Sequence, residues 1–260
     1  MQQPIGVFDS GVGGTSIWKE IQKMLPNESV IYLADGKNAP YGTKSKEEIL
    51  RLSIKNTELL LEKGCKLIVV ACNTATTNAI DYLRTTYEVP FVGIEPAIKP
   101  AALKTKTKKV GILATKGTLS SSLFHNTSKL HASGIEVVER EGTGLVDLIE
   151  RGQVNAKETY LLLQKYIAPM LEAGIDCLVL GCTHYPYLIP QIQKMVPTDL
   201  NIIDSGEAVA RQTRAVLEQQ NLLAISRKNL SEHQFYTNRE LEVLKSFVMG
   251  PNIQVSYLDF

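Results

Sequence analysis

Two cysteines, Cys72 and Cys182, each come directly after a short apolar run, at the point where a helix is expected to begin. The unpaired N–H groups and the dipole of a helix N-terminus favour a thiolate over a thiol, so both positions suit a reactive cysteine. The alternative is that a buried cysteine serves only as a small hydrophobic side chain, which is common for this residue type. We adopt that alternative for Cys65 and Cys177, because each falls at the start of a predicted strand.

The two candidate cysteines lie in matching segments of the chain. Gly-Cys-Lys-Leu-Ile-Val-Val-Ala-Cys ends at Cys72 and Gly-Ile-Asp-Cys-Leu-Val-Leu-Gly-Cys ends at Cys182. A second matching pair occurs in the same order: Ile-Gly-Val-Phe-Asp ends at Asp9, and Val-Gly-Ile-Leu-Ala ends at Ala114. Any two buried parallel strands are similar in composition, but two matches in the same order favour a duplicated unit.

Two thiols that face one cleft suggest a reaction with an acid and a base on opposite sides of one carbon. Inversion of a carbon through a planar carbanion is such a reaction, because one group removes the proton while the other returns a proton. Each thiol then needs a polar neighbour that can hold its proton. Asp9, at the end of the first predicted strand, is the candidate beside Cys72, and His184 is the candidate beside Cys182. A purely structural hydrogen bond is the alternative for His184.

The loop from Asp9 to Thr15, Asp-Ser-Gly-Val-Gly-Gly-Thr, follows the first predicted strand. Its glycines permit a tight turn, and we expect its backbone N–H groups to be free to hold an anion. Gly11, Gly13 and Asp35 also imitate a dinucleotide-binding fingerprint, but the third glycine of that motif is replaced by Ser16.

Other polar groups are expected beside the two cysteines, either after a strand or in the turn at residues 39–42. They could hold a substrate carboxylate or amine, and they are Ser10, Tyr41, Gly42, Asn73, Thr74 and Thr183.

Short apolar runs alternate with helix-like segments, which predicts an α/β protein with parallel sheets covered by helices on both faces. We expect strands at residues 5–8, 30–33, 67–70, 91–94, 110–113, 135–138, 178–180 and 201–203. The repeat predicts two similar α/β domains related by a pseudo-twofold axis. Ligands of open α/β sheets bind at the carboxyl ends of strands, so the active site is expected in the cleft between the domains.

The repeat places the first α/β domain at residues 1–95 and the second at residues 96–206. Residues 207–260 form a C-terminal tail that is too short for a third domain, and we expect it to pack back on the first domain. Within the tail we expect a helix at 207–220, a strand at 234–236, a helix at 239–248 and a strand at 253–257.

The composition excludes several classes of protein. A formal net charge of +1 gives no overall field that would attract nucleic acid or an anionic membrane. No apolar stretch approaches the roughly 18 residues of a membrane span, and the N-terminal residues lack the pattern of a secretory signal. We therefore expect a cytoplasmic protein with reduced cysteines, and a solvated linker in the lysine-rich run at 104–109. The spacing of the four cysteines and four histidines does not favour a structural zinc site.

Several strings beside these residues resemble the glutamate racemases of the aspartate/glutamate racemase superfamily. The resemblance covers nearly the whole chain except the tail. The matching strings are Gly-Val-Phe-Asp-Ser-Gly-Val-Gly-Gly at 6–14, Ala-Asp at 34–35, Pro-Tyr-Gly at 40–42, Ala-Cys-Asn-Thr-Ala-Thr at 71–76, Gly-Ile-Glu-Pro at 93–96, Leu-Gly-Cys-Thr-His-Tyr-Pro at 180–186 and Ile-Asp-Ser at 203–205.

The resemblance implies a role for each matching residue. Cys72 would deprotonate D-glutamate with the help of Asp9, and Cys182 would deprotonate L-glutamate with the help of His184. The residues implied in substrate binding are Asp9, Ser10, Tyr41, Gly42, Asn73, Thr74, Thr183 and His184, and Asp35 and Glu150 stand where the family has acidic residues near the site. The family uses neither pyridoxal phosphate nor a metal, supplies D-glutamate for peptidoglycan in the bacterial cytoplasm, and usually forms homodimers.

Three alternatives remain open from the sequence. An aspartate or hydantoin racemase would keep both cysteines but would differ in the residues that bind the substrate. An enzyme similar to maleate isomerase would use one cysteine as a covalent nucleophile. A non-catalytic amino-acid binding protein would also have two facing α/β units, and it would bind glutamate without turnover.

Overall fold

The computed structural model describes residues 3–224 and 231–260, in which every strand belongs to a parallel sheet. The strands are β1 (Ile5–Asp9), β2 (Val30–Ala34), β3 (Leu67–Val70), β4 (Phe91–Gly93), β5 (Lys109–Ala114), β6 (Glu136–Glu141), β7 (Cys177–Gly181), β8 (Asn201–Ile203), β9 (His233–Thr237) and β10 (Ile253–Tyr257). Each predicted strand is present to within one residue at either end, except β6. That strand lies at the edge of its sheet and continues through charged residues, where the apolar pattern has already ended.

Helices follow most of the strands. The longer ones are α1 (Thr15–Met24), α2 (Lys46–Glu62), α3 (Asn73–Thr86), α4 (Ile98–Lys104), α6 (Ser122–His131), α7 (Leu145–Glu150), α8 (Lys157–Glu172), α10 (Gly206–Gln219) and α11 (Leu241–Phe247). Single turns complete the set: η1 (Gly36–Asn38), η2 (Tyr41–Thr43), α5 (Lys116–Leu119), η3 (Tyr185–Leu188) and α9 (Ile189–Ile192). Among the described residues, no helix is both long and apolar enough to cross a membrane.

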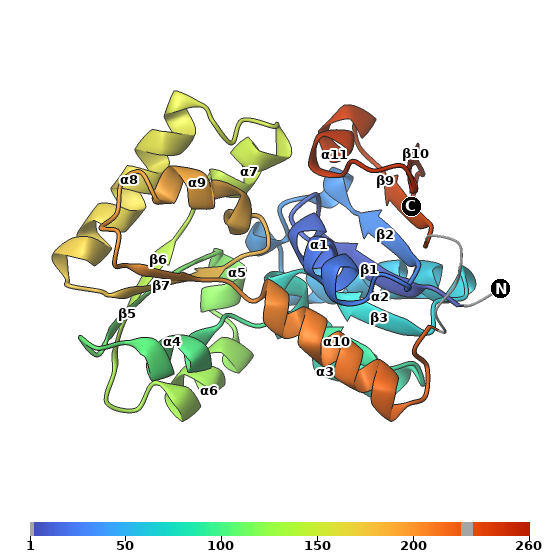
Figure 1. Cartoon of the computed structure of the whole chain (residues 1–260), viewed down its shortest axis with the longest axis horizontal. Helices are drawn as coiled ribbons and strands as arrows, with labels where there is room; N and C mark the ends of the chain where they lie inside the picture. The colour runs from blue at the N-terminus through green and yellow to red at the C-terminus, as the bar shows by residue number, and fades with distance from the viewer. Residues whose placement is uncertain (1–2, 225–230) are drawn as a thin grey trace.

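The strands form two separate sheets, which lie in two lobes of the molecule (Figure 1). The first sheet has the order β10-β9-β2-β1-β3-β4, and the second has the order β6-β5-β7-β8. If the two tail strands are set aside, both sheets have the same arrangement: the first strand of the unit lies between the second and the third, and the fourth is at the edge. The repeat in the sequence therefore corresponds to a repeat in topology, with β1 equivalent to β5 and β3 equivalent to β7.

Helices cover both faces of the first sheet, as expected for parallel strands. Successive strand residues point to opposite faces, so Val7 packs with Trp18 of α1 while Phe8 packs with Leu52 of α2. The second sheet follows the same rule: Leu113 of β5 belongs to the large core that includes α8, and Ile112 packs toward α4 and α6.

The chain passes between the lobes twice, from β4 to α4 and from β8 to α10. The two crossing segments are joined, since the Ser205 hydroxyl donates to the Glu95 carbonyl at 2.5 Å. After the second crossing, α10 packs against α1, and β9 pairs with β2 in the first sheet. The division into domains at residues 95 and 206 stays a prediction. The lysine-rich run at 104–109 spans the end of α4 and the start of β5, and its last residue is not free in solvent, because the Lys109 ammonium donates to Ala173 at 2.9 Å.

The tail strand β9 carries a buried titratable group whose effect on stability can be measured. Burial lowers the pKa of His233 to about 4, and the ring packs edge-on against Trp18. In the unfolded chain His233 binds a proton near pH 6.5, whereas in the folded protein its ring stays neutral until the pH approaches about 4. The free energy of unfolding therefore has its full value above about pH 6.5 and decreases as the pH falls toward about 4. This decrease in the free energy of unfolding is at most about 3 kcal/mol.

We expect His233→Phe, which keeps a ring against Trp18, to unfold with a weaker dependence on acid than the wild type. Thermal unfolding at about pH 7.5 and about pH 4.5 measures this difference. The same acid-induced decrease in Tm in both proteins would contradict the assignment.

Candidate active site

The ends of β1, β3, β5 and β7 meet at one pocket between the two sheets. The pocket is lined by Ser10, Pro40, Tyr41, Gly42, Cys72, Asn73, Thr74, Thr115, Val146, Cys182, Thr183 and His184. The structure therefore brings both candidate cysteines to the same space, from equivalent strands of the repeat. The cavity is only about 10 Å³, roughly the room that one water molecule needs. An amino acid can therefore enter only when the segments from the two lobes move apart.

Cys72 is the N-cap of α3, as the sequence predicts. Its Sγ accepts the Ala75 N–H at 3.5 Å and lies 3.8 Å from Ser10 Oγ. Burial nevertheless raises the pKa of Cys72 well above its usual range, and the charge of Asp9 adds to this effect. The hydrogen bonds with Ala75 and Ser10 oppose the shift but do not outweigh it. The expectation that the helix N-terminus makes this thiol acidic is wrong for the closed pocket, because loss of solvation is the larger effect.

Cys182 has a different local structure. We expected a helix to begin directly after it, but the chain forms only the short turn η3, which begins at Tyr185. Its polar partner is His184, whose Nδ1 lies 3.7 Å from the Cys182 Sγ. The sequence prediction that His184 lies beside Cys182 therefore agrees with the geometry.

The His184 ring is held between Cys182 and Glu150. Its Nε2 donates to Glu150 Oε1 at 2.6 Å, and both side chains are buried. Burial alone would lower the pKa of His184, but the hydrogen bonds to Cys182 and Glu150 and the charges of Cys182 and Asp9 raise it well above its usual range. The raised pKa keeps a proton on this ring, next to the Cys182 sulfur. The backbone nitrogen of Gly13 lies 3.3 Å from the same Nε2 and can donate there only in the other tautomer of the ring.

Asp9 lies beneath the pocket and is completely buried. Its carboxylate accepts the Gly14 N–H at 2.8 Å and the Thr183 hydroxyl at 3.4 Å. Burial raises the pKa of Asp9, although the charge of His184 and the Gly14 N–H oppose the shift. Asp9 therefore acts on Cys72 through its charge, while its hydrogen bonds go to Gly14 and to the residue next to Cys182.

The glycine-rich loop does not leave its N–H groups free for an external anion, contrary to the expectation. The protein's own carboxylates occupy them: Val12 N–H donates to Glu150 at 2.7 Å, and Gly14 N–H donates to Asp9. Glycine is required at two positions because of this close approach. A Cβ atom at Gly11 would overlap the Glu150 carboxylate, and one at Gly13 would overlap the His184 ring. This arrangement also leaves no room for a dinucleotide phosphate at the loop.

Asn73 presents an unused amide to the pocket. Both its Oδ1 and its Nδ2 are buried and have no hydrogen-bond partner among the residues that the structure describes. A buried amide without partners is costly, so the group is suited to a ligand that offers both a donor and an acceptor. Beside it, the hydroxyls of Thr74, Thr115 and Thr118 form a cluster across the two lobes, with 2.9 Å between the first two oxygens.

Tyr41 and Asp35 form a pair at the edge of the pocket. The ring of Tyr41 lines the pocket, but its hydroxyl donates to Asp35 Oδ2 at 2.6 Å. Burial and the neighbouring Asp35 charge raise the pKa of Tyr41 well above its usual range, so the phenol keeps its proton. Asp35 itself does not line the pocket, and neither does Glu150; both contact residues that do.

Three lining residues, Pro40, Thr115 and Val146, were not among the predicted site residues, although Pro40 lies in the turn at 39–42 that supplied two of them. The repeat contained a signal for Thr115, because it follows β5 just as Ser10 follows β1. Val146 lies on α7 with apolar neighbours, and nothing in its local sequence distinguishes it from a core residue. Among the described residues, no group of three or more His, Cys, Asp or Glu side chains is placed to hold a metal ion.

Cys65 and Cys177, predicted as packing residues, lie outside the pocket. Burial raises the pKa of Cys65 to about 12 and that of Cys177 to about 11.

Comparison with known proteins gives a consistent result. Residues 5–213 match the model of the Asp/Glu/Hydantoin racemase family. A glutamate racemase from Herpetosiphon aurantiacus is 48% identical over 221 residues, covering 85% of this chain and 87% of the relative. A glutamate racemase from Pseudomonas paraeruginosa is 44% identical over 260 residues, covering 98% and 97%. The solved structure of Escherichia coli glutamate racemase with L-glutamate and the activator UDP-MurNAc-ala has a TM-score of 0.85 at 33% identity, covering 98% of each chain.

The buried carboxylate of Asp9 predicts a trade-off between stability and activity. Because folding raises the pKa of Asp9 above the unfolded value of about 3.9, ionisation costs stability as pH rises above that value. Asp9→Asn keeps the shape of the side chain and cannot ionise. We expect its free energy of unfolding to equal that of the wild type near pH 3 and to exceed it increasingly as pH rises, while activity falls.

Denaturant unfolding of Asp9→Asn and the wild type over this pH range checks the expectation. Asp81→Asn is the matched control, since Asp81 is exposed on α3. If Asp9→Asn were no more stable than the wild type at pH 8, or if the difference in their free energies of unfolding did not change with pH, the buried Asp9 charge would not be costly.

Proposed function

The chain belongs to the Asp/Glu/hydantoin racemase family and is an amino-acid racemase, and from this premise we propose that it interconverts L- and D-glutamate through Cys72 and Cys182. The observation that carries the proposal is that both thiols line one pocket from equivalent strand ends. Racemisation needs one proton acceptor and one donor on opposite faces of the α-carbon, and two thiols from two facing sheets meet that requirement. Relatives named as glutamate racemases, and solved structures of such enzymes with L-glutamate and with D-glutamate, support the choice of substrate.

In the proposed reaction one thiol gains a proton and the other loses one, and the same steps run in both directions. The Cys182 thiolate removes the α-proton of L-glutamate, and the C–H electron pair remains on the α-carbon as a planar carbanion. The Cys72 thiol then protonates the opposite face, which leaves Cys182 as a thiol and Cys72 as a thiolate. D-glutamate reacts by the reverse sequence, with Cys72 as the base.

The surroundings of each thiol support this division of roles. The raised pKa of Cys72 favours the protonated form, which is ready to donate to a carbanion. The His184 ring, held by Glu150, lies next to the Cys182 sulfur and is placed to exchange a proton with it. Asn73 and the hydroxyls of Ser10, Thr74 and Thr183 are the groups we assign to the carboxylates and the amine of the substrate.

The remaining parts of the proposal concern the cell. We assign the enzyme to the bacterial cytoplasm, where D-glutamate is consumed in peptidoglycan synthesis. We further propose that it acts as a homodimer and that its reaction uses the two thiols without pyridoxal phosphate or a metal.

The direct test incubates each glutamate enantiomer with the protein in D₂O without an added cofactor. We expect both enantiomers to be inverted, with one deuterium at Cα of the product. Glutamate that binds but neither inverts nor exchanges would identify an amino-acid binding protein. A trapped covalent cysteine adduct without exchange at Cα would identify an isomerase with a nucleophilic cysteine.

The two-base assignment is tested by Cys72→Ser and Cys182→Ser. Because the enantiomers have equal free energies, kcat/KM for inversion must decrease equally in both directions and cannot distinguish the bases. Exchange without inversion can do so. We expect Cys72→Ser to retain residual Cα exchange only with L-glutamate, and Cys182→Ser only with D-glutamate.

Cys65→Ser and Cys177→Ser are the matched controls, because both cysteines are buried outside the pocket. They should keep wild-type inversion. If either site variant exchanged both enantiomers alike, the assignment of one base to each face would be wrong.

A further inference from the structure

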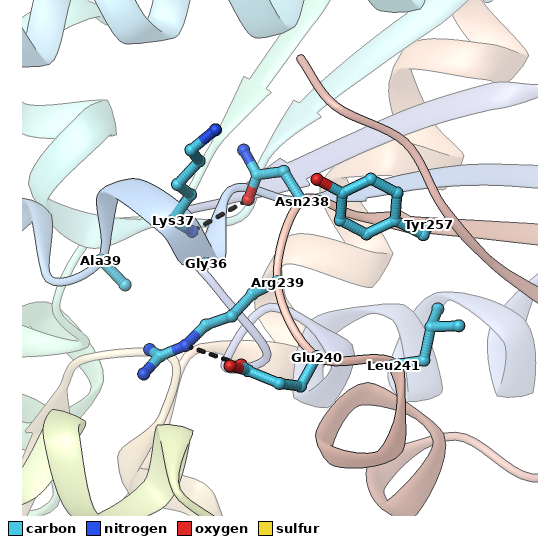
Figure 2. Close-up of a pocket in the computed structure, with 8 residues that line it drawn as sticks. All are labelled: Gly36, Lys37, Ala39, Asn238, Arg239, Glu240, Leu241 and Tyr257. Atoms are coloured by element: carbon cyan, nitrogen blue, oxygen red, sulfur yellow. Dashed lines mark hydrogen bonds and ion pairs between the residues drawn. The ribbon is translucent and has the colours of Figure 1, made fainter.

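The loop at residues 36–42 contributes to two separate cavities. Tyr41 and Gly42 line the active-site pocket. Gly36, Lys37 and Ala39 line an open groove of about 750 Å³ (Figure 2). A segment with solvent behind it is not held by close packing on that side. Specific hydrogen bonds therefore contribute to the position of the loop, together with the packing of the buried Tyr41 ring.

Asp35 precedes this loop and holds it with a completely buried carboxylate. Oδ1 accepts from the amides of Asn38 at 2.8 Å and Asn238 at 2.6 Å. Oδ2 accepts from the Tyr41 hydroxyl at 2.6 Å and the Lys55 ammonium at 3.2 Å. Every lone-pair direction of the carboxylate is thus directed at a protein group, which makes Asp35 a structural acceptor and leaves it no free position for proton transfer to a substrate.

Asn238 reaches this carboxylate from the C-terminal tail. The sheet register is the cause: Thr237, the last residue of β9, pairs with Ala34, the last residue of β2, so the next residues of both strands emerge side by side. The Asn238 amide nitrogen donates to Asp35, and its oxygen accepts the Lys37 N–H at 2.9 Å (Figure 2). The Asn238 side chain therefore binds both the backbone at the start of the loop and the Asp35 carboxylate that holds the loop.

We propose that Asn238 is a positioning residue for the racemase reaction and that it acts through Asp35 and Tyr41 on the wall of the active site. This proposal rests on the proposed function. The last step of the path is the Tyr41 ring, which is buried in the same cluster as Cys72 and is fixed by its hydrogen bond to Asp35. The Asn56 amide holds the same phenol oxygen at 3.1 Å, so the ring position is set by Asp35 and Asn56 together. The tail is therefore part of the catalytic structure.

The test compares Asn238→Ala with the wild type in the glutamate inversion assay. Small displacements of a positioning group cost up to about 100-fold in rate, and we expect kcat/KM to fall by about 10-fold or more. Asn252→Ala is the matched control, since it removes an asparagine from the same tail outside the contacts with the loop. Both variants should be assayed well below their Tm, where each is folded, and only Asn238→Ala should lose activity.

A double-mutant cycle with Tyr41→Phe separates positioning from a general loss of stability. Tyr41→Phe removes the hydroxyl that joins the ring to Asp35, so Asn238→Ala should cause little further loss in that background. Asn238→Ser replaces Asn238→Ala if the alanine variant does not fold. The shorter serine side chain cannot reach both Asp35 and Lys37, so kcat/KM should also fall in this variant.

Wild-type activity in Asn238→Ala or Asn238→Ser, or an undiminished loss in the Tyr41→Phe background, would overturn the proposal. Absence of inversion in the wild-type protein would instead reject the proposed function itself.

Discussion

The buried carboxylate of Glu150 connects the two lobes at the active site. It lies on α7 of the second lobe, and it accepts both the Val12 N–H of the first lobe and the Nε2 proton of His184. Breaking a buried charged pair by removing one partner is strongly destabilising, because the other charge loses its compensation. Glu150 contributes, after Cys182, to the raised pKa of His184, and through the same carboxylate it joins the glycine-rich loop to the second lobe. Glycine at position 11 leaves room for the Glu150 carboxylate, and glycine at position 13 leaves room for the His184 ring.

The fold is symmetric around the pocket, but the electrostatics are not. Both cysteines follow equivalent strands, yet Cys72 has a negative neighbour in Asp9, and Cys182 has a positive partner in His184. The local backbone also differs, since Cys72 caps the long helix α3 and Cys182 precedes only a short turn. A duplicated unit thus supplies the two-sided geometry, and the side chains that differ between the copies give the two thiols different polar neighbours.

Local patterns in the sequence were sufficient to predict what depends on local structure. Apolar strands followed by Asp-Ser, Cys-Asn-Thr or Cys-Thr-His, together with the turn at residues 39–42, identified nine of the twelve residues that line the pocket. Contacts between distant segments had no such signal. The bonds from Val12 to Glu150 and from Asn238 to Asp35 join residues 138 and 203 positions apart, and no periodicity records which side chains meet across folded lobes. The raised pKa of Cys72 was missed for a related reason, because the cap is visible in the sequence whereas the degree of burial depends on the second lobe.

The closed pocket and the perturbed thiol are consequences of the same packing. Closure leaves room for about one water molecule, and the loss of solvation that results is the largest cause of the raised pKa of Cys72. When the lobes separate to admit a substrate, water reaches the pocket and this contribution decreases. Closure around a bound amino acid then replaces water with Asn73 and the threonine hydroxyls, groups that are fixed before the substrate arrives. The ionisation of Cys72 is therefore coupled to the exclusion of water from the pocket. Glu150 on one side and Asp35 on the other are the buried carboxylates that hold the segments around it in place.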